Sequence, residues 1–432
     1  MLELYFKQAI ELIRQNKLFT GIYIFGTALA IASTTILAVV IYLDVAPIYP
    51  DTNRENVYYL NNSAFKGKND KSQYVSGYSY TAVNEWFYTL KNVKTVSAEY
   101  GSGMNVHLKH NYKNYELRGV YTDVNFFDVY NYRFIVGAPF TKADFDGELR
   151  KAVISDETAR ELYGTETDAV GKTVRIGYRD YTVCGVFEEP SVIAGESFAE
   201  VILPYTTHEY YRFKHGEIAY LGSYTLRFVV ENDEQAEALR VELVDVFNRF
   251  SNSNQDWNVN FQYLHLTSAT RKSRKLDGWY EFHKSEGGIL LLIGVFILLL
   301  IPALNLSGMI SSRMEMRKLE MGVRKSFGAT RSSLLKQVMW ENLILTIIGG
   351  IVGVILCWLI IFGCKDFLML AFIGENASVA GVDIDITAEM VFAPAVYIFS
   401  LGACVLLNVM SAYIPAKRAL SHPVVEMLND KK

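Results

Sequence analysis

Four long apolar runs dominate the pattern of hydrophobic and polar positions along the chain. None of them contains Asp, Glu, Lys, Arg or His. A helix needs about 20 consecutive apolar residues to cross the hydrocarbon core of a bilayer, and uncharged runs of this length are uncommon in soluble domains. The pattern therefore predicts four transmembrane helices. They cover residues 18–43, 287–310, 343–364 and 390–414.

The charges between these runs predict how the helices are oriented. Segment 311–342 is rich in Lys and Arg, segment 415–432 again carries cations near the membrane, and segment 365–389 has mainly acidic side chains. Short loops rich in Lys and Arg remain in the cytoplasm. We therefore expect a cytoplasmic loop at 311–342, a short outer loop at 365–389 and both termini in the cytoplasm, with residues 44–286 on the outer side.

Residues 1–17 precede the first apolar run and have a different periodicity. Leu2, Phe6, Ile10 and Ile13 recur at helical spacing, with Lys, Arg and Glu side chains between them. This pattern is typical of an amphipathic helix at a membrane surface, whose apolar face enters the lipid while its cations lie among the headgroups. Membrane lipids are therefore an expected partner of this cytoplasmic segment.

The region 44–286 mixes strand and helix patterns. Ser155 is suited to cap a helix that ends at Tyr163, and Asn232 or Asp233 is suited to cap a later one. The predicted strands cover 55–60, 94–100, 151–154, 172–176, 181–187 and 224–230, with a hairpin turn at 177–180 and a helix at 82–91; the last helix carries an apolar stripe of Ala236, Leu239, Leu243, Val244, Phe247 and Phe250. The predicted fold class is therefore a membrane protein with four transmembrane α-helices and an α+β domain, of one or two lobes, inserted between the first and second spans.

No catalytic or nucleotide-binding motif occurs in these 432 residues. The P-loop sequence, the H-E-x-x-H zinc motif, the G-x-S-x-G elbow and a G-x-G-x-x-G after a strand are all missing. His107 and His110 would point to opposite faces of a strand, and the four cysteines are expected to be small buried side chains. We expect no enzyme activity, cofactor, metal site or nucleic-acid partner. Because the apolar runs hold no charge for an ion path, the energy for any transport has to come from another protein.

The basic segment 311–342 predicts a structured element. Its sequence is typical of two short helices broken at Gly328, the second capped by Thr330 or Ser332. A rigid element of this kind could dock in a groove of a partner protein. The alternative is an ordinary basic loop that lies on anionic lipid.

Small and rigid residues in the apolar runs indicate helix contacts. Gly349, Gly350 and Gly353 form a patch on the third run that permits close helix approach, although glycines tolerated in lipid are an alternative. Pro302 removes a backbone donor and is expected to bend the second run, chiefly for packing. Asn408 is suited to an interhelical hydrogen bond.

Several motifs resemble one family of membrane proteins. The run from Leu319 to Arg324, followed by Gly328-Ala329, resembles the E-I-G-I-R and G-A signature of MacB-like and FtsX-like ABC transporter permeases. The tail from Pro415 to Leu428 is similar to that family's P-A-R-R-A and P-V-E-A-L, with one extra Val. Segments of the outer region that resemble the family's periplasmic core are 119–127, 137–140, 152–155 and 170–174.

This resemblance implies a permease subunit of the bacterial inner membrane without a fused ATPase domain, and a MacB-like periplasmic core at 44–286. A dimer of separate ABC ATPase subunits, which bind ATP and Mg, would lie beneath two permease subunits, the second being another copy or a paralogue. Closure of the ATPase dimer would move the periplasmic domains, a mechanism called mechanotransmission. The implied cargo for export or extraction is a peptide, lipid, lipoprotein, antibiotic or toxin, with a periplasmic adaptor and an outer-membrane duct as candidate partners.

The resemblance also assigns roles to residues. It places the coupling contact with the ATPase at Glu320, Gly322, Arg324, Gly328 and Ala329, and Glu341 matches an acidic residue at the start of the third span. An alternative within the resemblance is an FtsX-like regulator that transports nothing and activates a cell-wall hydrolase. Crosslinking from the outer domain would separate the two functions, because transport requires a duct or acceptor and regulation requires a hydrolase.

Overall fold

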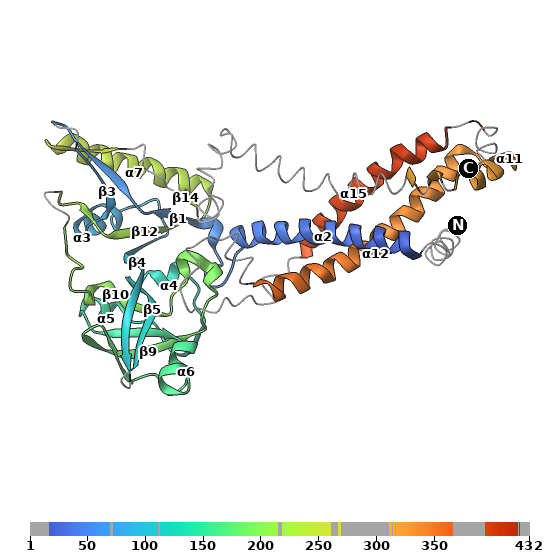
Figure 1. Ribbon diagram of the computed structural model, residues 1–432. Helices are drawn as coiled ribbons and strands as arrows, with labels where there is room; N and C mark the ends of the chain where they lie inside the picture. Colours follow the sequence, from blue (N-terminus) through green and yellow to red (C-terminus); the bar gives the residue numbers. More distant parts are fainter. Residues whose placement is uncertain are drawn as a thin grey trace. The chain divides into compact units, whose positions relative to one another are not determined.

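The chain forms two compact units, each described by itself below. The computed structural model describes residues 17–69, 72–110, 113–214, 218–260, 267–268, 311–312, 314–315, 317–365, 394–421 and 423. One unit contains the long apolar helices and the other contains the α+β domain (Figure 1).

Among the described residues of the first unit, three helices are long and apolar enough to cross a membrane. They are α2 (Lys17–Val45), α12 (Arg331–Gly363) and α15 (Pro394–Ala419). The first, third and fourth predicted spans lie on these helices, which confirms them as helical. The second predicted span at 287–310, with Pro302, lies outside the described residues, as do residues 1–16 and 366–393, which include the first four residues of the fourth predicted span.

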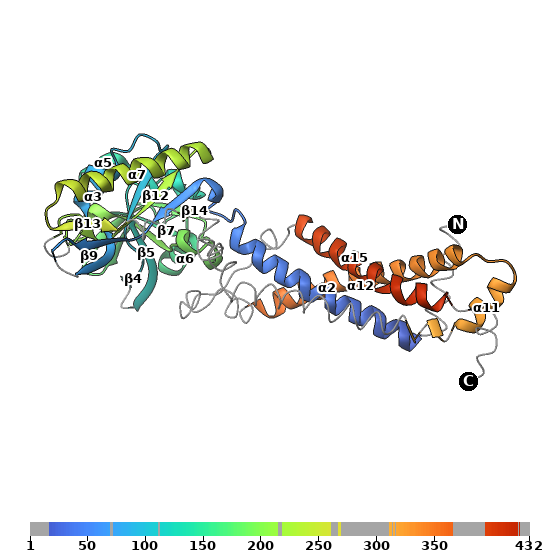
Figure 2. The same ribbon diagram turned by 90° about the horizontal axis from the view of Figure 1, so that it is seen from above.

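The helices pack side by side in both views (Figures 1 and 2). Helix α12 contacts α15, and its glycines approach α2. Helix α15 continues through Pro415 to Ala419, so the segment expected to be a tail begins as helix. A short helix, α11 (Lys318–Ser326), precedes α12.

The second unit is built on a mixed sheet. Its strands follow the order β13-β2-β3-β12-β4-β5-β10-β7-β9-β6, with β1 beside β12, β8 between β4 and β9, and short strands β11 and β14 beside β3 and β1. The strands are β1 (Val57–Leu60), β2 (Ser63–Gly67), β3 (Gln73–Tyr78), β4 (Thr95–His110), β5 (Lys113–Thr122), β6 (Phe134–Gly137), β7 (Lys151–Ser155), β8 (Thr173–Ile176), β9 (Arg179–Phe187), β10 (Val201–Pro204), β11 (Leu221–Gly222), β12 (Tyr224–Val229), β13 (Trp257–Asn260) and β14 (Thr267–Ser268). The helices are α3 (Tyr80–Ala82), α4 (Phe126–Val129), α5 (Lys142–Asp146), α6 (Asp156–Tyr163) and α7 (Asp233–Ser253).

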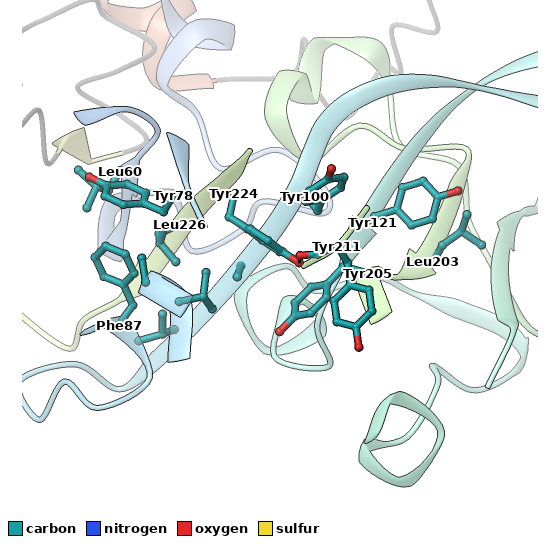
Figure 3. Close-up of a cluster of buried hydrophobic side chains, with 14 of the residues drawn as sticks. Leu60, Tyr78, Phe87, Tyr100, Tyr121, Leu203, Tyr205, Tyr211, Tyr224 and Leu226 are labelled. Atoms are coloured by element: carbon teal, nitrogen blue, oxygen red, sulfur yellow. Dashed lines mark hydrogen bonds between the residues drawn. The ribbon is translucent and has the colours of Figure 1, made fainter. Parts of the chain in front are cut away.

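Both faces of this sheet are buried, because successive side chains of a strand point to opposite faces. In β12, Leu226 and Phe228 belong to one hydrophobic cluster and Val229 to another. The first cluster is rich in aromatic rings, including Tyr78, Phe87, Tyr205 and Tyr224 (Figure 3), and the apolar stripe of α7 packs in it. Helix α4 contributes Phe126 and Val129 to the second cluster. One connected path of strands therefore runs through the domain, with a buried cluster on each face of β12.

Local predictions in this domain are largely confirmed. Ser155 caps α6 by accepting a hydrogen bond from the Thr158 amide, and Asn232 caps α7 by accepting one from the Gln235 amide. Strands β8 and β9 pair as the predicted hairpin. The stripe of α7 differs at one position, since Val246 is buried where Val244 was expected.

Two predictions were wrong. The helix expected at 82–91 ends at Phe87, after α3 and one π-helical turn. The amides of Lys91 and Asn92 donate instead to the Glu242 carboxylate of α7, so a tertiary contact replaces the helical hydrogen bonds. Among the cysteines, Cys364 at the end of α12 is exposed and not buried, because the helix stops beside it.

Candidate functional site

The candidate site is the elbow between α11 and α12, defined here as residues 317–341. Gly328 has a φ of +91°, in the left-handed region that favours glycine, and Thr330 caps α12 by accepting a hydrogen bond from the Ser333 amide. The predicted break and cap are confirmed. The second helix is not short, however. It is the beginning of α12, which has no proline among its 33 residues and continues into the third predicted span.

Five polar side chains close a ring between the two helices, which we call the elbow ring. Arg317 donates from Nε to Glu320 at 3.1 Å and from Nη1 to Glu341 at 2.6 Å. Gln337 donates to the other oxygen of Glu341 at 3.0 Å. Arg324 donates to Gln337 at 3.0 Å and to Glu320 at 2.6 Å, which completes the ring. The ring therefore fixes the angle of α11 on α12 through five hydrogen bonds, each of them charge-assisted.

The inner half of this ring is buried and the outer half is partly exposed. The side chains of Arg317 and Glu341 are 16% and 3% exposed, whereas those of Arg324 and Glu320 are 38% and 44% exposed. Partial burial opposes the ionisation of Glu320, but the hydrogen bonds and charges of Arg317 and Arg324 outweigh it and lower the pKa of this carboxyl. Breaking the buried pair is expected to cost more than breaking the exposed one, because water screens the outer charges.

Two further cations tie the elbow to the end of α15. Lys325 Nζ and Arg331 Nε each donate to the backbone carbonyl oxygen of Leu420 at 2.7 Å. Such contacts satisfy a carbonyl that the end of a helix leaves without an intrahelical partner. Four cations of the basic segment thus have partners inside the chain. This weakens the alternative in which the segment is an ordinary basic loop held by lipid headgroups.

An apolar cluster, which we call the elbow core, lies beneath the ring. Met321 of α11 packs here with Leu334 and Val338 of α12, Tyr23 of α2 and Ala416 of α15. The other buried members are Met314, Leu345, Ala412 and Leu420. Because four helices share one cluster, α11 cannot tilt without moving side chains of α2, α12 and α15.

The structure brings together only some of the residues expected to make the coupling contact. Glu320 and Arg324 meet in the elbow ring, where they bond to side chains of their own chain. Gly322 is buried, Gly328 is exposed at the turn, and Ala329 is half-buried against the elbow core. Glu320 and Arg324 therefore orient α11 through bonds within their own chain, whatever else they contact.

Sequence reasoning missed Arg317 and Gln337 as members of this site. Gln337 and Glu341 are four positions apart on α12, and Glu320 and Arg324 of α11 lie three and seven positions after Arg317, the residue that precedes this helix. These spacings place each set on one helix face, so charge patterning could have indicated them. The meeting of the α11 face with the α12 face is a tertiary contact.

The three glycines of α12 lie where neighbouring helices approach closely. A Cβ atom built on Gly353 would lie 2.7 Å from the carbonyl oxygen of Ala28, and one on Gly349 would lie 2.8 Å from Thr27 Cβ, both on α2. A Cβ on Gly350 would lie 2.5 Å from Leu401 Cδ1 of α15. Small side chains at these positions let α2 and α15 pack against the backbone of α12.

Buried hydrogen bonds join the same three helices near the elbow core. The Tyr23 hydroxyl of α2 donates to the Asn342 side chain and lies 3.2 Å from Thr346 Oγ1, both on α12. Asn408 of α15 donates to Thr346 at 3.3 Å, which confirms the predicted interhelical role of this asparagine. Polar groups buried among apolar helices favour one packing register because other registers leave them unsatisfied.

Within the part of the chain that the structure describes, no group of three or more His, Cys, Asp or Glu side chains is arranged to hold a metal ion. His107 of β4 is exposed, and the ring of His110 lies 5.1 Å from that of Tyr163. Among the described residues, the elbow combines a closed polar ring with an apolar core shared by four helices.

Two family models match the chain. A model described as the MacB-like periplasmic core domain matches residues 20–246, and one described as the FtsX-like permease C-terminal matches residues 292–424. Similar proteins include the macrolide export ATP-binding/permease protein MacB of Escherichia coli strain K12, 25% identical over 367 residues that cover 82% of this chain and 52% of the relative. The pyoverdine export ATP-binding/permease protein PvdT of Pseudomonas savastanoi pv. phaseolicola is 25% identical over 238 residues, or 54% of this chain and 34% of the relative.

The chain thus spans about half or less of the length of these relatives. Among solved structures, the periplasmic region of MacB from Actinobacillus actinomycetemcomitans is similar over 51% of this chain and 92% of its own, with a TM-score of 0.37 and 15% sequence identity. The extracellular domain of the ABC-type transporter YknZ from Gram-positive bacteria is similar over 46% of this chain, with a TM-score of 0.33 and 17% identity.

Proposed function

The chain belongs to the family of MacB-like and FtsX-like ABC transporter permeases, and we propose that it couples ATP hydrolysis by a separate ATPase subunit to motion of its periplasmic domain. The observation that carries this proposal is the elbow, where a polar ring and an apolar core connect α11 to three long apolar helices. These 432 residues hold no P-loop sequence, so ATP and Mg would bind to the partner.

The proposed topology has four spans, both termini in the cytoplasm and the α+β domain in the periplasm. Three apolar helices support it, together with the uncharged run at 287–310. The Lys and Arg side chains of segment 311–342 support a cytoplasmic elbow in the inner membrane of a bacterium. On this topology, a force applied to α11 enters the membrane through α12 without an intervening flexible loop.

The proposed contact region for an ATPase dimer is α11 with the turn that follows it. This region contains Glu320, Gly322, Arg324, Gly328 and Ala329. Gly349, Gly350 and Gly353 would transmit movement sideways, because their close contacts leave α2 and α15 little freedom to slide on α12. A second copy or a paralogue would complete the permease, and an adaptor and an outer-membrane duct are candidate partners.

The proposed activity is export or extraction of a cargo handled in the periplasm, such as a peptide, lipid, lipoprotein, antibiotic or toxin. The relatives are named for the export of macrolides and pyoverdine, which supports a transport role for this chain. No separate feature favours the alternative of a hydrolase regulator over transport.

The test measures nucleotide-dependent motion in the full chain with its ATPase subunit in lipid nanodiscs. A spin label at the fully exposed Tyr178, introduced as Tyr178→Cys after replacement of the four native cysteines, reports the distance between two copies. We expect this distance distribution to differ between the ATP-bound and ADP-bound states. An ATPase subunit with its P-loop Lys changed to Ala is the control and should show no difference. An unchanged distribution in both states, or the lack of any associated ATPase, would refute the proposal.

A further inference from the structure

His208 is half-buried at the point where the segment after η4 (Tyr205–Thr207) meets β4 and β5. Its ring centroid lies 4.7 Å from that of Tyr100 and 4.8 Å from that of Tyr121. These two tyrosines are buried and are direct cross-strand partners on β4 and β5 (Figure 3). We call residues 208–210, which begin at this ring, the latch turn.

The imidazole ring of His208 also makes a hydrogen bond within the latch turn. The backbone amide of Tyr210 donates to His208 Nδ1 at 3.2 Å, which closes a turn of the kind that Asn and Asp side chains make with the amide two residues later. A ring nitrogen that accepts a hydrogen bond carries no proton, so this ring is neutral and its proton is on Nε2. The turn therefore requires the uncharged form of His208.

The charged and titratable groups around this ring come from β4, β5, β9 and the same segment of chain. They are Tyr100, Tyr121, Arg179, Tyr181, Glu209 and Tyr210. Burial opposes the charged ring most strongly, the negative charge of Glu209 favours it, and the positive charge of Arg179 opposes it. The balance holds the pKa of His208 below its usual 6.5.

Bonds on both sides of the latch turn do not involve the ring. Before the turn, Arg179 donates from Nη1 to the carbonyl oxygen of Thr207. After it, the Tyr211 hydroxyl donates to Glu148 at 2.6 Å, and the Tyr211 carbonyl oxygen accepts a hydrogen bond from the Tyr224 hydroxyl at 2.7 Å. A change confined to the ring would therefore open the short stretch between two anchored ends and leave the rest of the domain folded.

We propose that His208 is an acid-sensitive latch, whose neutral ring holds the latch turn on β4 and β5 and whose protonation releases it. A protonated Nδ1 is a donor, so it would face the Tyr210 amide as a second donor and the bond between them would be lost. Tyr210 is 57% exposed at the end of the turn. The outer unit would thus present a different surface in acid, a property that goes beyond the proposed function and does not depend on it.

The direction of the effect follows from proton linkage. Because the pKa of the ring is lower in the closed turn than in the open one, the closed turn binds fewer protons, and it is held fully above pH 6.5 and weakened as the pH falls below that value. Loss of one hydrogen bond changes an equilibrium by about two- to tenfold. We expect the opening equilibrium of the latch turn to rise by this factor between about pH 7.5 and about pH 5.

The experiment follows the full chain in lipid nanodiscs over a series of pH values. Exchange of the imidazole C2 hydrogen, measured by mass spectrometry, gives the pKa of individual histidines, and the exposed His107 is the internal control. We expect a lower pKa for His208 than for His107. Attraction of a cation to the rings of Tyr100 and Tyr121 acts in the opposite direction, so a pKa of His208 equal to or above that of His107 would overturn the latch.

Backbone amide exchange of residues 208–211, corrected for the intrinsic effect of pH, measures opening of the turn in the same samples. His208→Asn keeps an acceptor for the Tyr210 amide but has no group that titrates between about pH 5 and about pH 8, so these amides should be protected throughout. His208→Phe keeps a ring but has no acceptor, so the same amides should exchange fast throughout. His107→Asn is the matched control and should keep the pH dependence of the starting protein.

Amide exchange of α7 should be alike in all four proteins, which shows that the domain is folded in each. A starting protein whose amides at 208–211 open equally at both ends of the pH range would overturn the inference. So would a His208→Asn variant with the pH dependence of the starting protein. Neither result bears on the proposed coupling to an ATPase, which is tested by nucleotide-dependent motion.

Discussion

Adding a single methyl group at Gly353 should destabilise the packing of α2 on α12. A Cβ atom there would lie 2.7 Å from the Ala28 carbonyl oxygen and 3.0 Å from Ile31 Cβ. The first atom belongs to the backbone of α2, so a rotamer change cannot relieve the contact. The two helices would have to separate by about 0.6–0.8 Å to restore an ordinary van der Waals distance.

The magnitude follows from two opposing effects. Alanine in a helix interior is favoured over glycine by about 0.5–1 kcal/mol. Overpacking a close contact costs about 1–3 kcal/mol, and a gap of 0.5–1 Å along the interface forfeits a quarter to a half of each dispersion contact. The net effect of Gly353→Ala is therefore a loss of about 1–2 kcal/mol. Gly349→Ala should behave alike, because Thr27 Cβ cannot rotate away.

Two variants on the same helices serve as controls. A Cβ at Gly350 would lie 2.5 Å from the terminal Cδ1 of Leu401, which can change rotamer, and at an ordinary contact distance of 3.5 Å from Ile31 Cδ1, so Gly350→Ala should be nearly neutral. Among the described residues, no atom beyond the helix's own backbone lies within 4 Å of a Cβ built on Gly26 of α2, and Gly26→Ala should be neutral or slightly stabilising. The expected order of stability is Gly26→Ala first, then Gly350→Ala, then Gly353→Ala.

The assay is thermal denaturation of the detergent-solubilised chain with a thiol-reactive dye. Cys357 and Cys404 are buried in α12 and α15 and report separation of the helices. The exposed Cys364 and the half-buried Cys184 of β9 are replaced by Ser to remove their background. We expect the midpoint of Gly353→Ala to fall below that of the starting protein. A midpoint equal to or above that of Gly26→Ala would refute the close approach of α2 and α12 and the reasoning built on it.

Three further outcomes are expected. Burial, with the nearby acidic side chains, raises the pKa of Glu189 from 4.5 to about 8, so the stability that the protonated carboxyl contributes below pH 4.5 is lost as the pH rises towards 8. Glu189→Gln should therefore raise the thermal midpoint at pH 8.5 and change it little at pH 5. Equal changes of the midpoint at both pH values would contradict this. Glu341→Ala removes a hydrogen-bond acceptor of Arg317 and should destabilise the attachment of α11 by about 1–3 kcal/mol. Hydrogen exchange of the α11 amides should become faster, while exchange of the α7 amides stays unchanged. Full protection of the α11 amides would count against the ring. Arg227 is buried with Glu99 at 2.8 Å, so Arg227→Met should lower the free energy of unfolding in urea by about 3–5 kcal/mol, and adding Glu99→Leu should restore part of it. A loss of unfolding free energy below about 1 kcal/mol would show that the pair is dispensable.

These predictions divide between features that a short stretch of chain can specify and features that it cannot. The apolar helices follow from run length alone, since each lipid-length uncharged run within the described residues became α2, α12 or α15. The caps at Ser155 and Asn232 and the hairpin of β8 and β9 follow from neighbouring residues, because their hydrogen bonds close over three to ten positions.

Only the tertiary structure determined which distant elements meet. The parallel pairing of β10 with β5 joins Val201 to Gly119, and the helix expected to reach Lys91 was ended by Glu242 from α7. Such contacts depend on the total burial of many side chains, for which no local pattern is a guide.

The elbow shows the same division at a functional site. The amino-acid sequence alone determined that a basic segment with a break at Gly328 and a cap at Thr330 or Ser332 lies between apolar runs. The fold decided that Glu320 and Arg324 turn inward to Arg317, Gln337 and Glu341, and that Leu319, Val323 and Phe327 face outward. The physical reason is that a helix presents every side chain at a known angle, but the surface against which it packs settles which angle is the buried one.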